Sequence, residues 1–238
     1  TKKERSYNEK FIKLCHAGGG RNLSSTHAFT LAEVLVTLGI IGVVSAMTVP
    51  SLMQNHQRKT YVTQLHKVYN ELSQALELYQ TDRNALNLKE AGLVNANNLD
   101  NFVKDYFKIV QECDTMDNCF ADEYKAMNGN VMSSAMYNRN VKSYVLADGA
   151  ALRPGFVQDG ERILNIAVDI NGKKGPNISG RDIFWLMVYT NGVIDDYGSS
   201  APLTASTRQS LYDKYCTTGF DFYGCFGKIL NDNWEMNY

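Results

Sequence analysis

The hydrophobic pattern is dominated by one continuous apolar run at residues 29–52, in which Glu33 is the only formally charged side chain. At about 1.5 Å per helical residue, this run is about 36 Å long, whereas the hydrocarbon layer of a membrane is about 30 Å thick. The pattern therefore predicts a helix that crosses a membrane once.

After residue 52 the pattern becomes amphipathic, because apolar residues recur every three or four positions through residues 53–82. This spacing places them on one face of a helix. They are Tyr61, Val62, Leu65, Val68, Tyr69, Leu72, Leu76 and Tyr79. We expect the same helix to continue out of the membrane and to lay this face on a globular head at residues 83–238. Pro50 lacks a backbone N–H and predicts a kink at the membrane exit.

The pattern within the head changes from weakly periodic to alternating. Residues 80–140 are rich in Asn and contain a short helix-like piece at residues 100–110, which predicts a variable surface insertion. Strand signals follow: residues 162–170 alternate as a half-buried strand should, and residues 183–190 form a continuous apolar and aromatic run. Residues 142–147 and 193–197 are also strand-like, and the turn signal Asn191-Gly192 joins 183–190 to 193–197. A long helix covering one face of an antiparallel sheet predicts an α+β fold.

The position of Glu33 leaves three interpretations of the apolar run, since a carboxylate near the centre of a bilayer costs about 2.5–3.5 kcal/mol. In the first interpretation the run is a simple signal anchor, and the side chain of Glu33 reaches the headgroups. Alternatively it is a secretory signal peptide cleaved at the small residues 44–46. In the third interpretation a cut after Ala28 frees the amine of Phe29, and a neighbouring copy shifted along its axis pairs that amine with Glu33.

Residues 1–28 form a basic leader with six basic and two acidic residues, a net charge of +4. Such a segment is held in the cytoplasm, and we expect it to be disordered and removed. Of the 24 basic and 25 acidic residues of the chain, 18 and 23 remain, a net charge of −5. Without a basic surplus, nucleic-acid binding is not expected.

The residues Ala28, Phe29, Thr30, Leu31 and Glu33 resemble the processing motif of type IV pilins and of the pseudopilins of type II secretion. That motif is usually Gly followed by Phe-Thr-Leu-x-Glu, so Ala28 departs from it. The resemblance implies cleavage after Ala28 by prepilin peptidase, methylation of the Phe29 amine and self-assembly into a helical filament. In that filament Glu33 would set the stagger between neighbours.

Gly42 and Pro50 stand where the family often has a Gly and a Pro bounding a part of the helix that loosens in the filament. The resemblance also implies partners, namely other pilins or pseudopilins and the assembly platform of the inner membrane. It places the chain in the bacterial inner membrane with a periplasmic head, and afterwards in a periplasmic pseudopilus or a surface filament.

A loop between two predicted strands carries the oxygen-bearing residues Asp169, Asn171, Asn177 and Asp182. Carboxylates and amides spaced two residues apart are typical of calcium loops, although this loop lacks a terminal Glu and contains two Lys. The segment also resembles loops in pseudopilin heads, some of which bind calcium. An ordinary tight loop and a weak calcium site both remain open, and no cofactor is required.

Four cysteines remain after the leader, which contains Cys15: they are Cys113, Cys119, Cys216 and Cys225. Four cysteines allow three pairings, and we predict the two local pairs because each closes a short loop in an oxidising compartment. A zinc site is the alternative. The C-terminal pair also resembles the disulfide-bounded loop of many pilins, and here it would enclose an aromatic loop at residues 217–224.

No catalytic motif was found, and His56 and His66 are ten residues apart on the helix and do not converge. We therefore expect that the protein is not an enzyme. The sequence favours a structural subunit of a type II secretion pseudopilus or of a type IV pilus-like filament, and it does not decide between the two. The alternative is an exported binding domain that stays monomeric and is anchored to the membrane by residues 29–52.

Overall fold

The computed structural model describes residues 29–133 and 139–238. The expected leader, with Ala28 and Cys15, lies outside the described residues. The chain divides between Ser51 and Leu52 into two compact units, and each is described by itself below.

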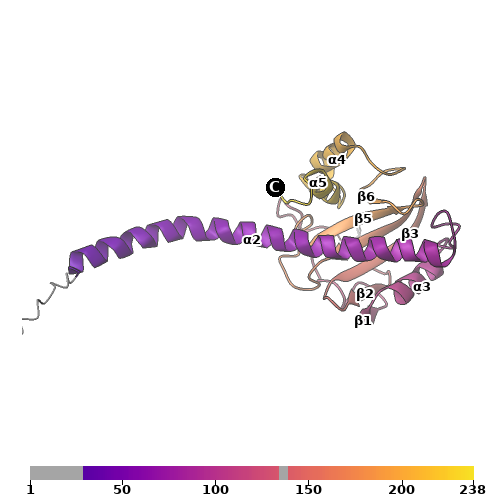
Figure 1. The fold of residues 1–238 in the computed structure, drawn as a ribbon, viewed down its shortest axis with the longest axis horizontal. Coiled ribbons are helices and arrows are strands. Elements are labelled where there is room, and N and C mark those ends of the chain that lie inside the picture. Colours follow the sequence, from indigo (N-terminus) through magenta and orange to yellow (C-terminus); the bar gives the residue numbers. More distant parts are fainter. Residues whose placement is uncertain (1–28, 134–138) are drawn as a thin grey trace, which may run out of the picture. The chain divides into compact units, whose positions relative to one another are not determined.

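One long helix, α2 (Leu31–Asp82), begins in the first unit and continues into the second (Figure 1). It contains both the apolar segment and the amphipathic segment that the sequence predicts. Pro50 lies inside the helix. A kink at this residue stays a prediction.

In the second unit, α2 buries the stripe that its periodicity predicts. The buried residues are Val62, Leu65, Val68, Leu72, Ala75, Leu76 and Tyr79. Their spacing of three and four residues keeps them on one face of the helix. Tyr61 and Tyr69 are partly buried beside them. The prediction that this half of the helix packs on a globular head is confirmed.

The sheet has six antiparallel strands whose order in space follows their order in the chain. The strands are β1 (Ile109–Cys113), β2 (Ser143–Leu146), β3 (Ala151–Asp159), β4 (Arg162–Asp169), β5 (Ile183–Tyr189) and β6 (Ile194–Asp195). With the long helix, this arrangement confirms the predicted α+β class. The four strands predicted from the sequence correspond to β2, β4, β5 and β6.

The strands β1 and β3 were not predicted. Pro154 and Gly155 interrupt the pattern of β3, and Pro is rare in central strands because it cannot donate to the ladder. The register explains why Pro154 is tolerated. β2 pairs with β3 only at Ala151 and Leu152, so β3 has a single neighbour, β4, at Pro154.

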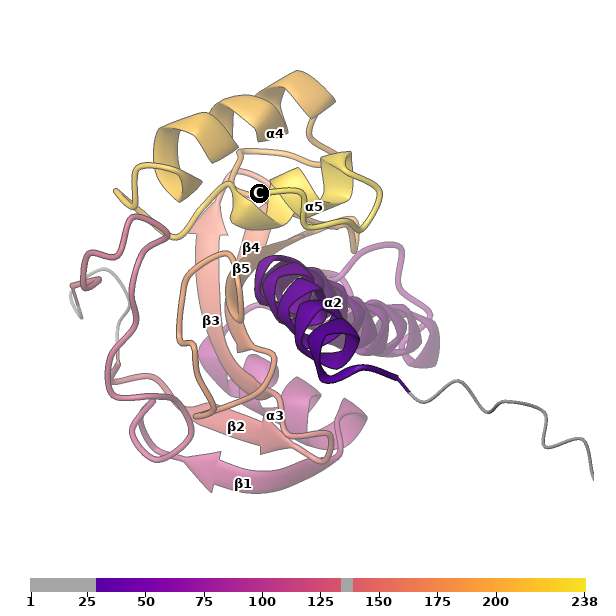
Figure 2. The same ribbon diagram turned by 90° about the vertical axis from the view of Figure 1, so that its left-hand side faces the viewer.

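Four short helical segments complete the second unit. They are α3 (Ala96–Tyr106), α4 (Ala205–Leu211), a π-helical turn at Tyr212–Cys216 and α5 (Cys225–Asn231). α3 begins earlier than the predicted piece at 100–110, because the side chain of Asn95 accepts a hydrogen bond from the backbone N–H of Asn98 and caps the helix there. Figure 2 shows α3 and α5 on either side of α2.

Both faces of the sheet are covered. Alternate residues of β5 divide between the two core clusters, as the two faces of a strand require. Phe184, Leu186 and Val188 join the cluster that contains α2. The second cluster contains Met116, Phe120 and Tyr124, which are fully buried. The prediction that residues 80–140 form a surface insertion is therefore wrong for this segment, which closes the second face.

Candidate functional site

The first half of α2 is an apolar surface that no part of its own unit covers. All side chains of residues 31–51 are exposed, and Leu31, Met47 and Leu52 are 76%, 75% and 65% exposed. Soluble monomers rarely expose contiguous apolar patches of more than a few hundred Å². Among the described residues, α2 is the one helix long and apolar enough to cross a membrane.

Glu33 closes the N-terminus of α2 together with Thr30. One oxygen of Glu33, Oε2, accepts hydrogen bonds from the backbone N–H of Thr30 at 2.8 Å and from its hydroxyl at 2.9 Å. The hydroxyl oxygen of Thr30 in turn accepts from the backbone N–H of Glu33 at 3.2 Å. This reciprocal pair is a capping box, which satisfies N–H groups that the first turn of a helix leaves free.

The capping box gives Glu33 a role within one copy of the chain, which the sequence interpretation missed. The signal was present, since Thr-x-x-Glu before an apolar run is the motif of a capping box. Capping of the helix within one copy and pairing with the amine of a neighbouring copy do not exclude each other. Oε2 accepts both hydrogen bonds from Thr30, and Oε1 accepts no hydrogen bond from the described residues. A carboxylate has lone pairs enough for a further donor.

No described residue packs closely enough on Gly39 or Gly42 to require a glycine there. A Cβ atom added at either position would meet no described atom within 4 Å. Small residues allow close approach between membrane helices, so a partner helix would supply a reason for both. An ordinary role as small residues in a membrane helix fits this observation equally well.

The cysteines form the two predicted disulfides, and the zinc alternative is wrong. Cys113 bonds to Cys119, and Cys216 bonds to Cys225. The first pair belongs to the core cluster with Met116, and the second belongs to the cluster that contains α2.

The Cys216–Cys225 loop presents its aromatic side chains in two directions. Phe222 is buried and stacks on Trp185 with ring centroids 4.4 Å apart. Phe220 is 68% exposed. Phe222 therefore belongs to the core, whereas Phe220 lies on the surface. Trp234, outside the loop, stacks on His66 at 4.0 Å, so this His packs against a ring.

Two buried aspartates attach this C-terminal region to the sheet, and sequence reasoning missed both. Asp195 accepts two hydrogen bonds from the guanidinium of Arg208 at 2.8 and 2.7 Å. Asp196 accepts from the backbone N–H groups of Gly224 and Gly227 at 2.9 and 2.7 Å. Gly224 has a positive φ of 87°, and a Cβ there would lie 2.3 Å from the carbonyl oxygen of Leu211, so only Gly fits.

The candidate calcium residues lie at the end of β4 and in the loop between β4 and β5, and their carboxylates already accept hydrogen bonds that hold this loop. Asp182 accepts from the backbone N–H groups of Asn177 and Ile178, both at 2.7 Å. Asp169 accepts from the Tyr124 hydroxyl at 2.5 Å and from the backbone N–H of Asn171 at 3.2 Å. Such bonds hold a tight loop without a metal ion.

The same loop also contains unsatisfied oxygen atoms. The side-chain oxygens Oδ1 of Asn171 and Asn177 are buried and accept no hydrogen bond from the described residues. Burial, together with the charge of Asp182, raises the pKa of Asp169 to about 8 against the opposing hydrogen bond of Tyr124. Two carboxylates and two free amide oxygens are hard ligands that suit calcium.

A metal ion at this loop would need the side-chain amide oxygens of Asn171 and Asn177 as ligands. Among the described residues, no three His, Cys, Asp or Glu side chains are grouped closely enough to hold a metal.

The features described so far define an α+β protein with an apolar helix of membrane length and a disulfide-bonded unit built on an antiparallel sheet. Comparisons with protein-family models, with curated proteins and with solved structures found no match.

Proposed function

We propose that the chain is a structural subunit of a pilin-like filament, either a type II secretion pseudopilus or a type IV pilus. It is inserted in the bacterial inner membrane with a periplasmic head, cleaved after Ala28 by prepilin peptidase and assembled through the apolar half of α2. Other pilins or pseudopilins and the assembly platform of the membrane are its partners. No catalytic step belongs to this function.

The observation that carries the proposal is the apolar half of α2, residues 31–51, whose only acid, Glu33, lies near the N-terminus of the helix. Every side chain of residues 31–51 is exposed, so a single copy leaves this surface to its surroundings. If a lipid bilayer alone covered this surface, the helix would need no acid in it. Glu33 keeps one oxygen available beyond its bonds to Thr30, and a cation from a neighbouring copy would stabilise it in an apolar environment.

The capping box makes the test of Glu33 specific. Gln at this position can still accept the hydrogen bonds of Thr30, because capping boxes use Glu or Gln. Glu33→Gln therefore keeps the cap and removes the charge, whereas Glu33→Ala removes both. Pairing between copies predicts that filament yield falls strongly and to a similar extent in both variants, as measured by sedimentation of sheared filaments. Membrane insertion, measured by extraction with detergent, should not change.

The opposite result would assign Glu33 to capping alone. In that case Glu33→Gln would assemble like the unmodified chain, and only Glu33→Ala would be impaired. Thr37→Ala is the matched control, because it removes a side-chain hydrogen bond to the Val34 carbonyl from the same apolar half without touching the cap.

N-terminal sequencing of the membrane-extracted protein separates the subunit from the alternative, a monomeric binding domain on a signal anchor. The subunit begins at Phe29, methylated on its amine, as mass spectrometry would show. A chain recovered with the basic leader intact has no free amine at Phe29 and would contradict the filament proposal.

We also propose that the loop around Asp169 and Asp182 binds calcium weakly. The buried oxygens of Asn171 and Asn177, which lack donors, favour this second property. The residues that would hold the ion are Asp169, Asn171, Asn177 and Asp182. The positive charge of the ion would balance two buried carboxylates that otherwise lack a counter-charge in this loop.

Calorimetry and thermal unfolding with calcium or with a chelator test this property. We expect heat of binding and a higher Tm with calcium, both abolished by Asn171→Ala. Asn231→Ala is the matched control, because its side-chain oxygen is also buried without a donor but lies elsewhere. No heat and an unchanged Tm in the unmodified chain would exclude a calcium site.

A further inference from the structure

A cavity of about 580 Å³ in the second unit is lined by two arginines that no carboxylate neutralises. Arg58 comes from α2 and Arg181 from the loop before β5, and Tyr61, Pro176 and Ile178 also line the cavity. Among the described residues, neither guanidinium makes an ion pair. Both side chains are partly exposed, so they are accessible to a ligand.

The carboxylates nearest in the chain are used elsewhere. Asp182, next to Arg181, is fully buried and accepts from the backbone N–H groups of Asn177 and Ile178. Glu235 lines a neighbouring cavity of about 520 Å³ together with Arg58 and Lys59, but it pairs with neither cation. The cavity therefore has positive charge without an internal counterion.

The fold brings these two cations together at a cost. Burial lowers the pKa of Arg181, and the charge of Arg58 lowers it further. Arginine nevertheless stays protonated in proteins. The ring of Tyr238 offers only partial compensation, since the Arg181 guanidinium carbon lies 5.4 Å from its centroid. An anion that contacted both guanidinium groups would relieve this repulsion.

The position of the cavity along the chain indicates the source of that anion. Arg58 is six residues after Leu52, where the apolar run ends, and α2 is continuous between them. Six helical residues rise about 9 Å. The headgroup layer on each side of a membrane is about 5–8 Å thick, so an arginine that follows the end of a membrane-spanning run by six helical residues can reach the headgroups with its side chain.

The surroundings of the cavity strengthen the attraction. Lys59 follows Arg58, and Lys173 and Lys174 are exposed on the loop that leads to Pro176. Basic residues just outside a membrane-spanning helix attract anionic lipids. Guanidinium groups suit phosphate because their planar donors bind two oxygens at once.

We propose that the cavity between Arg58 and Arg181 binds the phosphate of an anionic lipid headgroup from the leaflet at the membrane exit of α2. This inference requires the membrane span but not the filament, so it survives if the chain proves to be a monomeric anchored domain. The bound lipid would hold the second unit close to the membrane surface.

The test uses the full chain in a neutral detergent, with phosphatidylglycerol or phosphatidylcholine added and the retained lipid counted by native mass spectrometry. One arginine near the membrane surface is worth about fivefold in affinity for an anionic lipid. We therefore expect phosphatidylglycerol to be retained in preference to phosphatidylcholine. The double variant Arg58→Gln with Arg181→Gln should bind phosphatidylglycerol about thirtyfold more weakly.

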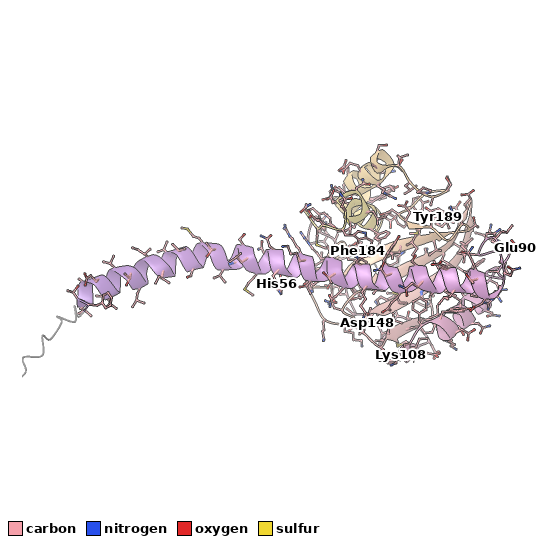
Figure 3. All side chains as sticks on the ribbon, in the orientation of Figure 1. His56, Glu90, Lys108, Asp148, Phe184 and Tyr189 are labelled. Carbon is pink, nitrogen blue, oxygen red and sulfur yellow. A yellow bond between two sulfur atoms is a disulfide. The ribbon has the colours of Figure 1, made fainter. Side chains whose placement is uncertain are left out.

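The matched control is the double variant Lys89→Gln with Lys108→Gln, which removes the same charge from exposed positions that form no ion pair with the described residues. Figure 3 shows His56, close to Arg58 in the chain, and Glu90, the neighbour of Lys89, at opposite ends of the second unit. The control should retain phosphatidylglycerol like the unmodified chain. An equal loss in both double variants would overturn the proposal, because it would reflect net charge alone.

Two further results would overturn it. If inorganic phosphate at the same concentration displaces the lipid completely, the site takes a free anion. If the unmodified chain retains no lipid but forms a dimer that the arginine variant lacks, the occupant is a carboxylate of a second copy. Near-UV circular dichroism checks that the arginine variant is folded. If it is not, the comparison of the two lipids and the phosphate competition on the unmodified chain decide alone.

Discussion

The two halves of α2 share one helix but place their apolar side chains in opposite environments. In the second half, a stripe of seven residues is buried against the globular unit, and the exposed residues are mostly polar, with apolar exceptions such as Leu78. In the first half, apolar residues surround the helix and all are exposed. The more apolar half therefore contributes nothing to the core of the chain. Hydrophobic content alone does not indicate where a core forms, because burial depends on the pattern of apolar positions and on a complementary surface.

The largest difference between the halves should appear when one Leu is truncated in each. Leu72 is 2% exposed and Leu38 is 60% exposed. Leu72→Ala leaves a cavity and should lower the free energy of unfolding by about 2–5 kcal/mol. Leu38→Ala should change it by less than about 0.5 kcal/mol. Guanidinium unfolding of the full chain in a neutral detergent measures both, and similar losses would break the comparison.

The Cys216–Cys225 disulfide should support only the second half of α2. Both sulfur-bearing residues belong to the core cluster on which that half packs. Replacing both with Ser should lower the free energy of unfolding by about 2–3 kcal/mol, because the unfolded chain gains freedom.

Hydrogen exchange locates this effect. Amides of residues 62–79 should exchange faster in the Cys216→Ser, Cys225→Ser variant, and those of residues 31–51 should not. The variant without Cys113 and Cys119, which lie in the other cluster, serves as the control, and its first changes should fall near β1. Faster exchange throughout α2 would contradict a separation between the halves.

The halves should also differ in their response to pH. Burial raises the pKa of Asp169 from an ordinary value near 3.8 to about 8. Between these values the folded chain holds a proton that the unfolded chain releases, so the free energy of unfolding falls as pH rises from about 4 to about 8. Each pKa unit corresponds to about 1.4 kcal/mol.

In the presence of a chelator, Asp169→Asn should flatten this dependence in the unfolding of the second unit, and the helix content of residues 31–51 should not respond to pH. Asp105→Asn, at an exposed position on α3, is the control and should retain the slope. A slope unchanged by Asp169→Asn would show that other groups control the effect.

The smallest expected effect is local to the first turn of α2. Thr30→Ala removes the side chain that accepts from the Glu33 N–H, which should destabilise the helix start by about 1 kcal/mol. Amides of residues 31–34 should exchange faster, whereas Thr48→Ala, which removes a hydroxyl bond to the Val44 carbonyl, should leave them unchanged. Equal changes in both variants would mean that the Thr30 cap does not stabilise the helix start specifically.

The elements with regular periodicity could be predicted from the sequence, and those held by distant contacts could not. α2 and β4 show a clear period of helix or strand, and β5 is a continuous apolar run that ends at a turn signal. β3 was hidden by Pro154 and Gly155, and their position is acceptable only because β2 stops pairing before them. The buried Met116 and Phe120 follow no period, because an irregular segment covers the second face of the sheet.

The residues of the candidate site also divide into those that could be predicted from the sequence and those that could not. The disulfide partners lie 6 and 9 residues apart and could be paired from an even count and short spacing. The buried Asp195 and Asp196 could not be predicted, since acids are usually exposed. Their partners Arg208 and Gly224 lie 13 and 28 residues further along the chain.

The order of the strands has a consequence for how the second unit reaches its folded state. Because every strand pairs with the next one in sequence, no strand has to wait for a partner beyond its neighbour in the chain, and pairings between segments close in sequence form faster than distant ones. Each strand pair can form as soon as its second strand is available. Cys216 and Cys225 follow all six of these strands in the chain, so oxidation of this pair would complete a sheet that has already grown strand by strand.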